Sequence, residues 1–194
     1  MEPPLVFLTG FGPFESVDDN PSGALARTLD GDPGIRGVEL PVTFAGSAEA
    51  WDAQVAALEE APAALLSLGV HPGPSFRLER RAGPELRADR ADTAGQTGAD
   101  LSGRMGGEEG DLFTSLDLDP LHQALIEGGW SGAIERSEDA GRYVCERIYR
   151  HVLVRGAERG VPGLFLHVPP LGCAPVDQQL GPVRALIQAL REQL

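Results

Sequence analysis

Three residues that could act together in catalysis stand in separate parts of the chain. Cys145 lies just inside a predicted helix, after the small pair Ala140-Gly141, where the positive end of the helix dipole favours a thiolate. His167 interrupts the apolar strand of "LFLHVPP", and Glu79 follows the strand-like "FRL". A thiol nucleophile needs a base, and the base needs a third group that orients it. The three residue types therefore suit nucleophilic catalysis by a cysteine.

Each of the three residues also has a structural interpretation. Cys145 could be a buried core thiol, and His167 could be a buried imidazole with satisfied hydrogen bonds. Glu79 is followed by Arg80 and Arg81, which suits a surface ion pair. The chain also holds many other carboxylates that could orient a histidine. The local sequence alone leaves both interpretations open.

The stretch "LVFLTGFGPF", residues 5–14, suggests a phosphate-binding turn after a first strand. It lacks the third glycine of a dinucleotide fingerprint, and Pro13 has no N–H to offer a phosphate. All 16 basic residues are arginine, so the lysine of a Walker loop or a Schiff-base enzyme is missing. Phe11 and Phe14 instead suit a flat apolar ring, or packing of the turn onto the core.

Short apolar strands alternate with amphipathic helices along the chain. Strands are expected at 5–9, 37–44, 63–70, 76–82, 132–137 and 163–169, and helices at 20–29, 47–60, 118–129, 140–156 and 176–194. Pro41 indicates an edge strand or a bulge, and Gly181-Pro182 either interrupts or starts the last helix. This alternation predicts an α/β fold, a three-layer α/β/α sandwich with a mostly parallel, twisted central sheet.

Length and composition suit a single domain over residues 1–194 with a long loop insertion near 83–112, which we expect to be mobile without substrate. The net charge of −13 disfavours nucleic acid and anionic membranes as partners. Two cysteines and four scattered histidines predict no metal site, and we expect no cofactor. No apolar run reaches ~20 residues and no signal peptide is recognisable, so a cytoplasmic location is expected.

Four ordered stretches resemble the pyroglutamyl peptidase I family of cysteine peptidases, and the resemblance runs nearly from end to end. "TGFGPF…NPS" is similar to the family's opening "TGF-x-PF…NPS", and "GVHPGPSFRLERRA" is similar to its glutamate segment. "SEDAGRYVCE" resembles the nucleophile segment, and "GLFLHVPPL" resembles the histidine segment. The resemblance assigns the catalytic roles to Glu79, Cys145 and His167.

The resemblance implies hydrolysis of the bond after an N-terminal pyroglutamyl residue of a peptide, through a thioacyl-enzyme. The partner would be such a peptide, and self-association as a homodimer or homotetramer is expected. A protein on the same fold that binds without catalysis, or with altered specificity, is the alternative. The substrate-binding residues expected on this basis are Phe11, Phe14, Asn20, Thr43, Tyr143 and Val144.

The chain also departs from the family pattern near its proposed site. Glu138, Asp139 and Glu146 stand where amides, hydroxyls, Asn or Asp are usual, and Pro74 replaces an arginine of the glutamate segment. The family's "ARIPDN" is barely recognisable in "RADRADTAGQ". Acidic neighbours disfavour a thiolate. We nevertheless expect Cys145 to be thiolate-prone, because a helix terminus and His167 act on it.

Overall fold

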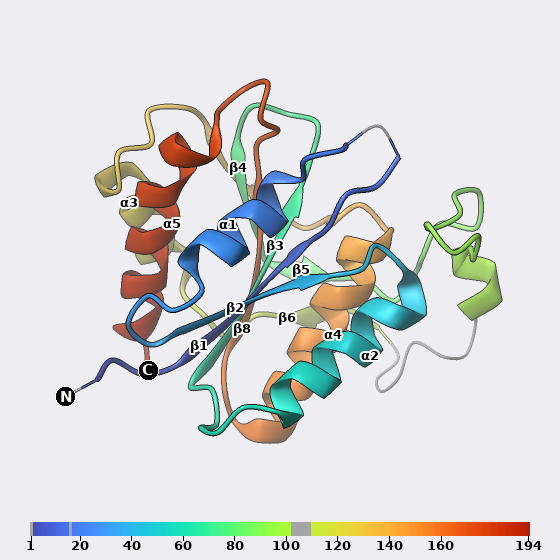
Figure 1. Ribbon diagram of the computed structural model, residues 1–194, viewed down its shortest axis with the longest axis horizontal. Helices are drawn as coiled ribbons and strands as arrows, with labels where there is room; N and C mark the ends of the chain where they lie inside the picture. Colours follow the sequence, from blue (N-terminus) through green and yellow to red (C-terminus); the bar gives the residue numbers. More distant parts are fainter. Residues whose placement is uncertain (1, 16, 102–109) are drawn as a thin grey trace.

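The centre of the molecule is a twisted six-stranded sheet (Figure 1). The computed structural model describes residues 2–15, 17–101 and 110–194. The strands run in the order β2-β1-β3-β8-β4-β7. β4 is antiparallel to β8, and the other neighbouring pairs are parallel. Their bounds are β1 (Val6–Phe11), β2 (Ile35–Leu40), β3 (Ala64–Val70), β4 (Phe76–Glu79), β7 (Ile134–Ser137) and β8 (Gly163–Val168).

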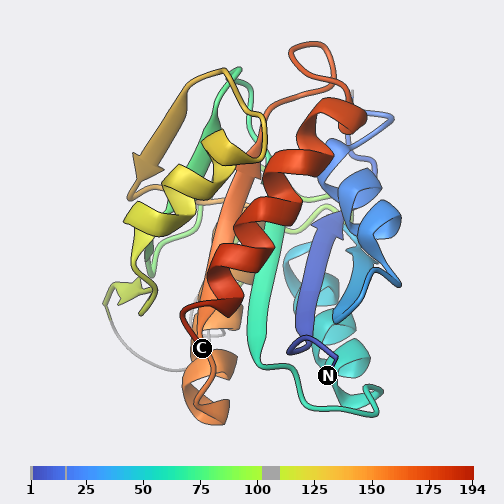
Figure 2. The same cartoon turned by 90° about the vertical axis from the view of Figure 1, so that its left-hand side faces the viewer.

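Helices cover both faces of this sheet and complete a three-layer α/β/α sandwich (Figures 1 and 2). One face carries α1 (Pro21–Leu29), α3 (Leu118–Glu127) and α5 (Val176–Arg191), and the other carries α2 (Phe44–Ala56) and α4 (Val144–Arg159). Each helix layer buries its apolar stripe against one side of the strands, which gives two hydrophobic clusters separated by the sheet. The predicted fold class is confirmed.

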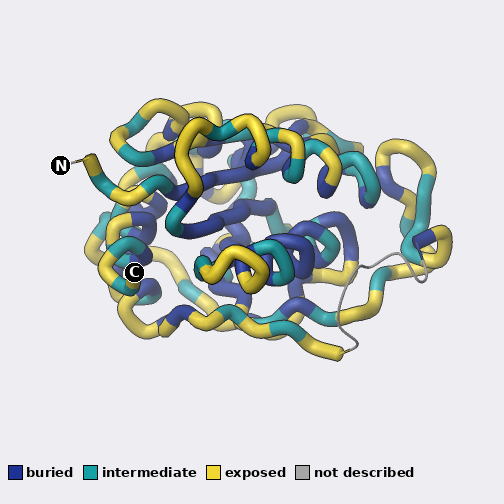
Figure 3. Tube along the Cα trace, turned by 90° about the horizontal axis from the view of Figure 1, so that it is seen from below, coloured by how far each residue is buried: buried dark blue, intermediate teal, exposed yellow. Residues whose placement is uncertain are grey.

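The central strands are the most enclosed part of the chain. All six residues of β1 and of β8 are buried, and only the last residue of β3 is partly exposed. Figure 3 shows these buried segments inside a shell of partly and fully exposed turns and helix faces. Strands that are buried on both faces read as continuous apolar runs in the sequence. His167 and Glu79 are therefore polar residues placed inside the core.

Local sequence signals explain the start of α1 and the edge of the sheet. The Asn20 side chain accepts from the N–H of Ser22 at 3.1 Å, and Pro21 occupies the first helical position. Pro41 directly follows β2, which lies at one edge of the sheet. A proline cannot donate to a sheet ladder, so its position at an edge strand agrees with the prediction.

The helices expected at 47–60 and 140–156 span Phe44–Ala56 and Val144–Arg159 instead. Two predictions that took a glycine as a helix boundary are also wrong. Helix α4, which carries Cys145, does not end at Gly156 but continues to Arg159, and Gly160 ends it in the left-handed conformation with φ of 67°. Gly156 is instead packed inside the helix, where a Cβ would meet the carbonyl oxygen of Val161. The last helix α5 starts at Val176 and contains Pro182 within it, so Gly181-Pro182 neither starts nor interrupts it.

The expected insertion at 83–112 is flanked by a small ladder. β5 (Arg81–Ala82) pairs antiparallel with β6 (Leu112–Phe113), and a 3-10 turn, η1, covers Gly98–Leu101. Residues 102–109 lie outside the described residues, so the expected mobility of the whole insertion stays a prediction. Within the described ranges, no helix has the length and apolar character needed to cross a bilayer.

Candidate active site

Cys145 and His167 line the same pocket, which has a volume of about 380 Å³. The pocket lies where β1, β3 and β8 end, and the N-terminus of α4 reaches the same place. The carboxyl ends of parallel strands are the usual position of a site in such folds. Its lining residues are Phe14, Glu15, Val17, Val70, His71, Pro72, Arg77, Arg90, Ala140, Gly141, Tyr143, Cys145, His167 and Pro170.

His167 and Glu79 form a buried hydrogen-bonded pair beneath this pocket. His167 Nδ1 lies 2.7 Å from Glu79 Oε1, and the Glu79 side chain is 0% exposed. The carboxylate accepts from Nδ1–H, so the ring presents Nε2 as its free proton acceptor. The antiparallel register pairs Glu79 with Phe165, two residues before His167, which places both side chains on the same face.

The second histidine of the pocket is held as a structural group. His71 Nε2 donates to the carbonyl of Ser75 at 2.6 Å, and His71 Nδ1 accepts from the N–H of Gly73 at 3.2 Å. Burial lowers the pKa of His71, which keeps the ring neutral. Because both of its nitrogens are engaged, His167 is the histidine that is suited to act as a base.

Cys145 stands at the second position of α4 and is half-buried. Its sulfur packs against the backbone of β3, because a Cβ built on Gly69 would lie only 2.9 Å from Sγ. The amides of residues 144–146 have no carbonyl partner inside the helix, since the first such bond runs from Arg147 to Tyr143. Cys145 therefore lies among backbone N–H groups that are not used by the helix itself and could hold an oxyanion.

The expectation that Cys145 is thiolate-prone is wrong for this structure. Burial, followed by the negative charges of Glu79 and Glu146, raises the pKa of Cys145 to about 12. The charge of Arg90 and the backbone N–H of Cys145 act in the opposite direction and do not offset these effects. Cys145 therefore rests as a thiol, and it would have to give up its proton in order to attack a carbonyl carbon.

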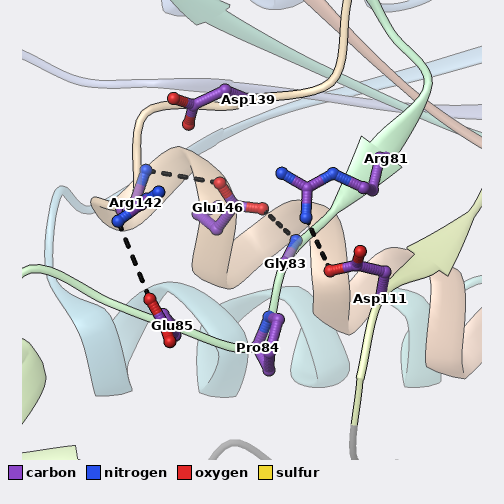
Figure 4. A pocket seen from close by; sticks show the side chains of 8 residues that line it. All are labelled: Arg81, Gly83, Pro84, Glu85, Asp111, Asp139, Arg142 and Glu146. Carbon is purple, nitrogen blue, oxygen red and sulfur yellow. Dashed lines mark hydrogen bonds and ion pairs between the residues drawn. The ribbon is translucent and has the colours of Figure 1, made fainter.

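Glu146 joins two segments beside the nucleophile (Figure 4). Its Oε1 accepts from the N–H of Gly83 at 2.5 Å, and its Oε2 accepts from the N–H of Arg142 at 3.3 Å. Arg142 has φ of 53°, so this bond holds a left-handed residue two positions before the first residue of α4. Burial raises the pKa of Glu146 despite these two donors.

The other two acidic departures have partners of their own. Glu138 accepts from Arg80 at 2.8 Å on the surface, and Asp139 Oδ1 accepts from the N–H of Gly141 at 2.9 Å. Of the three, Glu146 alone is buried, and its charge contributes to the raised pKa of Cys145. It is the departure that changes the nucleophile most directly.

Phe14 and Tyr143 are the expected substrate-binding residues that line the pocket. The Tyr143 hydroxyl donates to the carbonyl of Ala91 at 2.9 Å, and the Arg90 guanidinium lies 4.2 Å from its ring centre. Both rings therefore border the space above Cys145. Their contact with a substrate stays a prediction.

The other four expected substrate-binding residues lie outside the pocket lining. Phe11 and Val144 are buried in the apolar cluster between the sheet and α4. Asn20 caps α1 and donates through Nδ2 to the carbonyl of Gly12 at 3.0 Å. Thr43 is the residue before α2. Among them, Asn20 holds the turn that leads to the pocket residue Phe14, through its bond to the carbonyl of Gly12.

Four charged or polar pocket residues were not expected from the sequence: Glu15, His71, Arg77 and Arg90. Arg77 had a usable signal, because it precedes Glu79 by two residues on a strand and so shares its face. Arg90 belongs to a loop without a clear pattern, and its pairing with Glu15 joins residues 75 positions apart. Among the described residues, no group of three or more His, Cys, Asp or Glu could hold a metal ion.

Known proteins resemble this chain in sequence over most of its length. The family model described as pyroglutamyl peptidase matches residues 5–193. The pyrrolidone-carboxylate peptidase of Deinococcus radiodurans is 37% identical over 175 residues, which cover 86% of this chain and 78% of the relative. That of Pseudomonas fluorescens is 32% identical over 171 residues, covering 85% and 78%.

Solved structures show the same fold. The pyrrolidone carboxyl peptidase of Pyrococcus furiosus superposes with a TM-score of 0.82 at 25% identity, covering 97% of this chain and 99% of that one. Pyroglutamyl peptidase I from Bacillus amyloliquefaciens superposes with a TM-score of 0.85 at 22% identity, covering 98% and 96%. The match of fold and sequence extends over nearly the whole chain, and the chain belongs to the pyroglutamyl peptidase family.

Proposed function

We propose that this protein is a cysteine exopeptidase that removes an N-terminal pyroglutamyl residue from peptides through a thioacyl-enzyme. The observation that carries the proposal is the 2.7 Å bond between His167 and Glu79, in a pocket that His167 shares with Cys145 at a helix N-terminus. A nucleophile, an oriented base and free backbone donors are the parts that acyl transfer requires.

The raised pKa of Cys145 determines the first step. His167 Nε2 takes the thiol proton while Sγ forms a bond to the pyroglutamyl carbonyl carbon. The Glu79 carboxylate holds Nδ1–H and stabilises the imidazolium that results. Amides at the start of α4 stabilise the oxyanion, and each such donor contributes roughly 3 kcal/mol. These pre-organised donors thus offset the cost of ionising the Cys145 thiol.

The remaining steps return the enzyme to its starting state. His167 passes its proton to the nitrogen of the leaving peptide, and the carbon–nitrogen bond breaks to give the thioacyl-enzyme. His167 then takes a proton from water, whose oxygen attacks the thioacyl carbon. The carbon–sulfur bond breaks, the proton returns to Sγ, and pyroglutamate is released. No step needs a metal ion or an external electron carrier.

The pocket suits the lactam ring of pyroglutamate, which carries no charge and no free amine. Phe14, Val17, Val70 and Tyr143 provide apolar surface around Cys145. Arg90 is paired with Glu15 at 2.9 Å, so these two charges compensate one another at the rim. A flat neutral ring is therefore better suited than a charged amino terminus.

A fluorogenic pyroglutamyl-amide reporter tests the proposal, with prolyl and glutaminyl amides as comparison substrates. Wild-type protein should release the fluorophore from the pyroglutamyl reporter, and Cys145→Ala should not. A stably folded wild type that is inert on the pyroglutamyl reporter refutes the proposal.

Two further expectations have tests of their own. Light scattering on the same preparation tests the expected dimer or tetramer. Fractionation of the source cells tests the expected cytoplasmic location.

A further inference from the structure

Arg77 lies beside the carboxylate that orients the catalytic histidine. It is directly opposite His167 in the antiparallel register of β4 and β8, and it precedes Glu79 by two residues on the same face of β4. Arg77 Nε lies 3.8 Å from Glu79 Oε1, the same oxygen that binds His167 Nδ1. The three side chains therefore form one contiguous group.

Strand β7 and the segment after it hold the Arg77 guanidinium in this position. One terminal nitrogen donates to Ser137 Oγ at 2.6 Å and to the carbonyl of Asp139 at 3.4 Å. Nε also lies 3.6 Å from Glu135 Oε2, a carboxylate that is more than half exposed. An arginine fixed by neighbours in this way keeps its charge close to Glu79 without a hydrogen bond to it.

The charge on Glu79 needs such a neighbour. A fully buried carboxylate is costly unless a countercharge or several hydrogen bonds compensate it. Its side chain accepts one hydrogen bond within the described part of the chain, from His167 Nδ1, and its other oxygen is buried without a hydrogen-bond partner there. Among the described residues, Arg77 is the arginine whose guanidinium lies within 4.0 Å of Glu79.

We propose that Arg77 is a positioning residue, which keeps Glu79 ionised so that Glu79 can hold His167 in the tautomer that accepts the Cys145 proton. The measurement of kcat rests on the proposed function, because it requires that the protein hydrolyses the reporter. If Arg77 is lost, Glu79 keeps a proton to higher pH, and a protonated Glu79 no longer stabilises the imidazolium. The acidic limb of the pH–kcat profile then moves to higher pH.

Other titratable and charged groups lie around this pair. They are Glu135 of β7, Cys145 and Glu146 of α4, His71 after β3, and Arg90 of the insertion. Tyr149 of α4 donates to the backbone carbonyl of Glu79 at 2.6 Å and leaves its carboxylate free. Removing a cation beside His167 also lets the imidazole keep its proton to higher pH, which moves the acidic limb in the same direction.

The test compares Arg77→Met, Arg77→Gln and Arg77→Lys with wild type. The two variants without charge should shift the acidic limb upward by about one pH unit or more, which lowers kcat about tenfold below the limb and less above it. In Arg77→Lys, the acidic limb should return most of the way to its wild-type pH. If Arg77→Met does not fold, Arg77→Gln and Arg77→Lys still compare a neutral with a positively charged side chain at this position.

A second readout does not depend on turnover. In protein with ¹³C-labelled glutamate carboxyls, assigned with Glu79→Gln, the signal reports the pH at which Glu79 takes up a proton. That pH should be higher in Arg77→Gln than in wild type, because the neighbouring positive charge is lost. This readout remains informative if the wild type proves inert on the reporter, so failure of the proposed function and failure of this inference are distinguishable.

Arg80→Met is the matched control, because Arg80 adjoins Glu79 in sequence but pairs with Glu138 on the surface. It removes the same charge and should leave both the pH–kcat profile and the Glu79 signal unchanged. A uniform loss of kcat at all pH values in Arg77→Gln would indicate a structural role and overturn the inference. An unchanged Glu79 signal in that variant would also overturn it.

Discussion

Replacing Gly69 with alanine should disable the nucleophile more than it destabilises the fold. A Cβ at this position would lie 2.7 Å from Phe165 Cζ and 2.9 Å from Cys145 Sγ. Phe165 is fully buried and packs against Tyr149 and His167, so its ring has little room to move. Cys145 borders the pocket, so its sulfur is the atom that yields.

The contact distances set the size of the effect. An ordinary van der Waals contact begins at 3.4 Å, so Sγ must move by at least about 0.5 Å. Because a misplacement of about 1 Å costs on the order of 100-fold in rate, kcat/KM should fall by roughly tenfold to 100-fold. Overpacking of this kind costs about 1–3 kcal/mol of unfolding free energy.

Gly163→Ala is the matched control for this prediction. Its Cβ would lie 2.8 Å from Val152 Cγ1, a side chain of the same helix two turns away from the nucleophile. Urea unfolding should show a comparable loss of stability in the two variants, while reporter hydrolysis should fall in Gly69→Ala alone. If Gly69→Ala keeps kcat/KM within about threefold of Gly163→Ala, the proposed displacement of Sγ is refuted.

Three further predictions follow from the protonation states and caps of the site. In protein without its second, exposed cysteine, alkylation of Cys145 by iodoacetamide should keep accelerating through about pH 10, because its pKa is about 12; a plateau near the ~8.5 of free cysteine would contradict this. Burial raises the pKa of Glu146 above 4.5, so its stabilising contribution is complete below about pH 4.5 and is lost as the pH rises through the folded-state pKa. Urea unfolding should therefore show that the free energy of unfolding of Glu146→Gln rises relative to that of wild type from about pH 4 to about pH 7. A difference between the two proteins that stays constant over this range would refute the raised pKa of Glu146. Asn20→Ala removes the α1 cap and the bond to the Gly12 carbonyl, so it should lower the free energy of unfolding by about 2 kcal/mol and raise KM. Asp117→Ala removes the cap of α3 and is the control, which should lose stability without a change in KM.

Much of the fold could be predicted from the local sequence pattern. Continuous apolar runs marked the central strands because they are buried on both faces, and Asn20 with Pro21 marked the start of α1. The end of α4 was not readable, because Gly156 looks like a helix stop but serves close packing inside the helix. A glycine signals permissive backbone, and only its surroundings decide how that is used.

The sequence by itself determined which residue types are available for catalysis and their order along the chain. Only the tertiary structure decided that Glu79 lies in contact with His167, 88 residues away, and that Phe14 lines the pocket while Phe11 lies in the core. It also decided that Cys145 rests as a thiol and that Arg77 stands next to Glu79. Burial and the distances between charges control these properties, and both arise from residues that are remote in sequence.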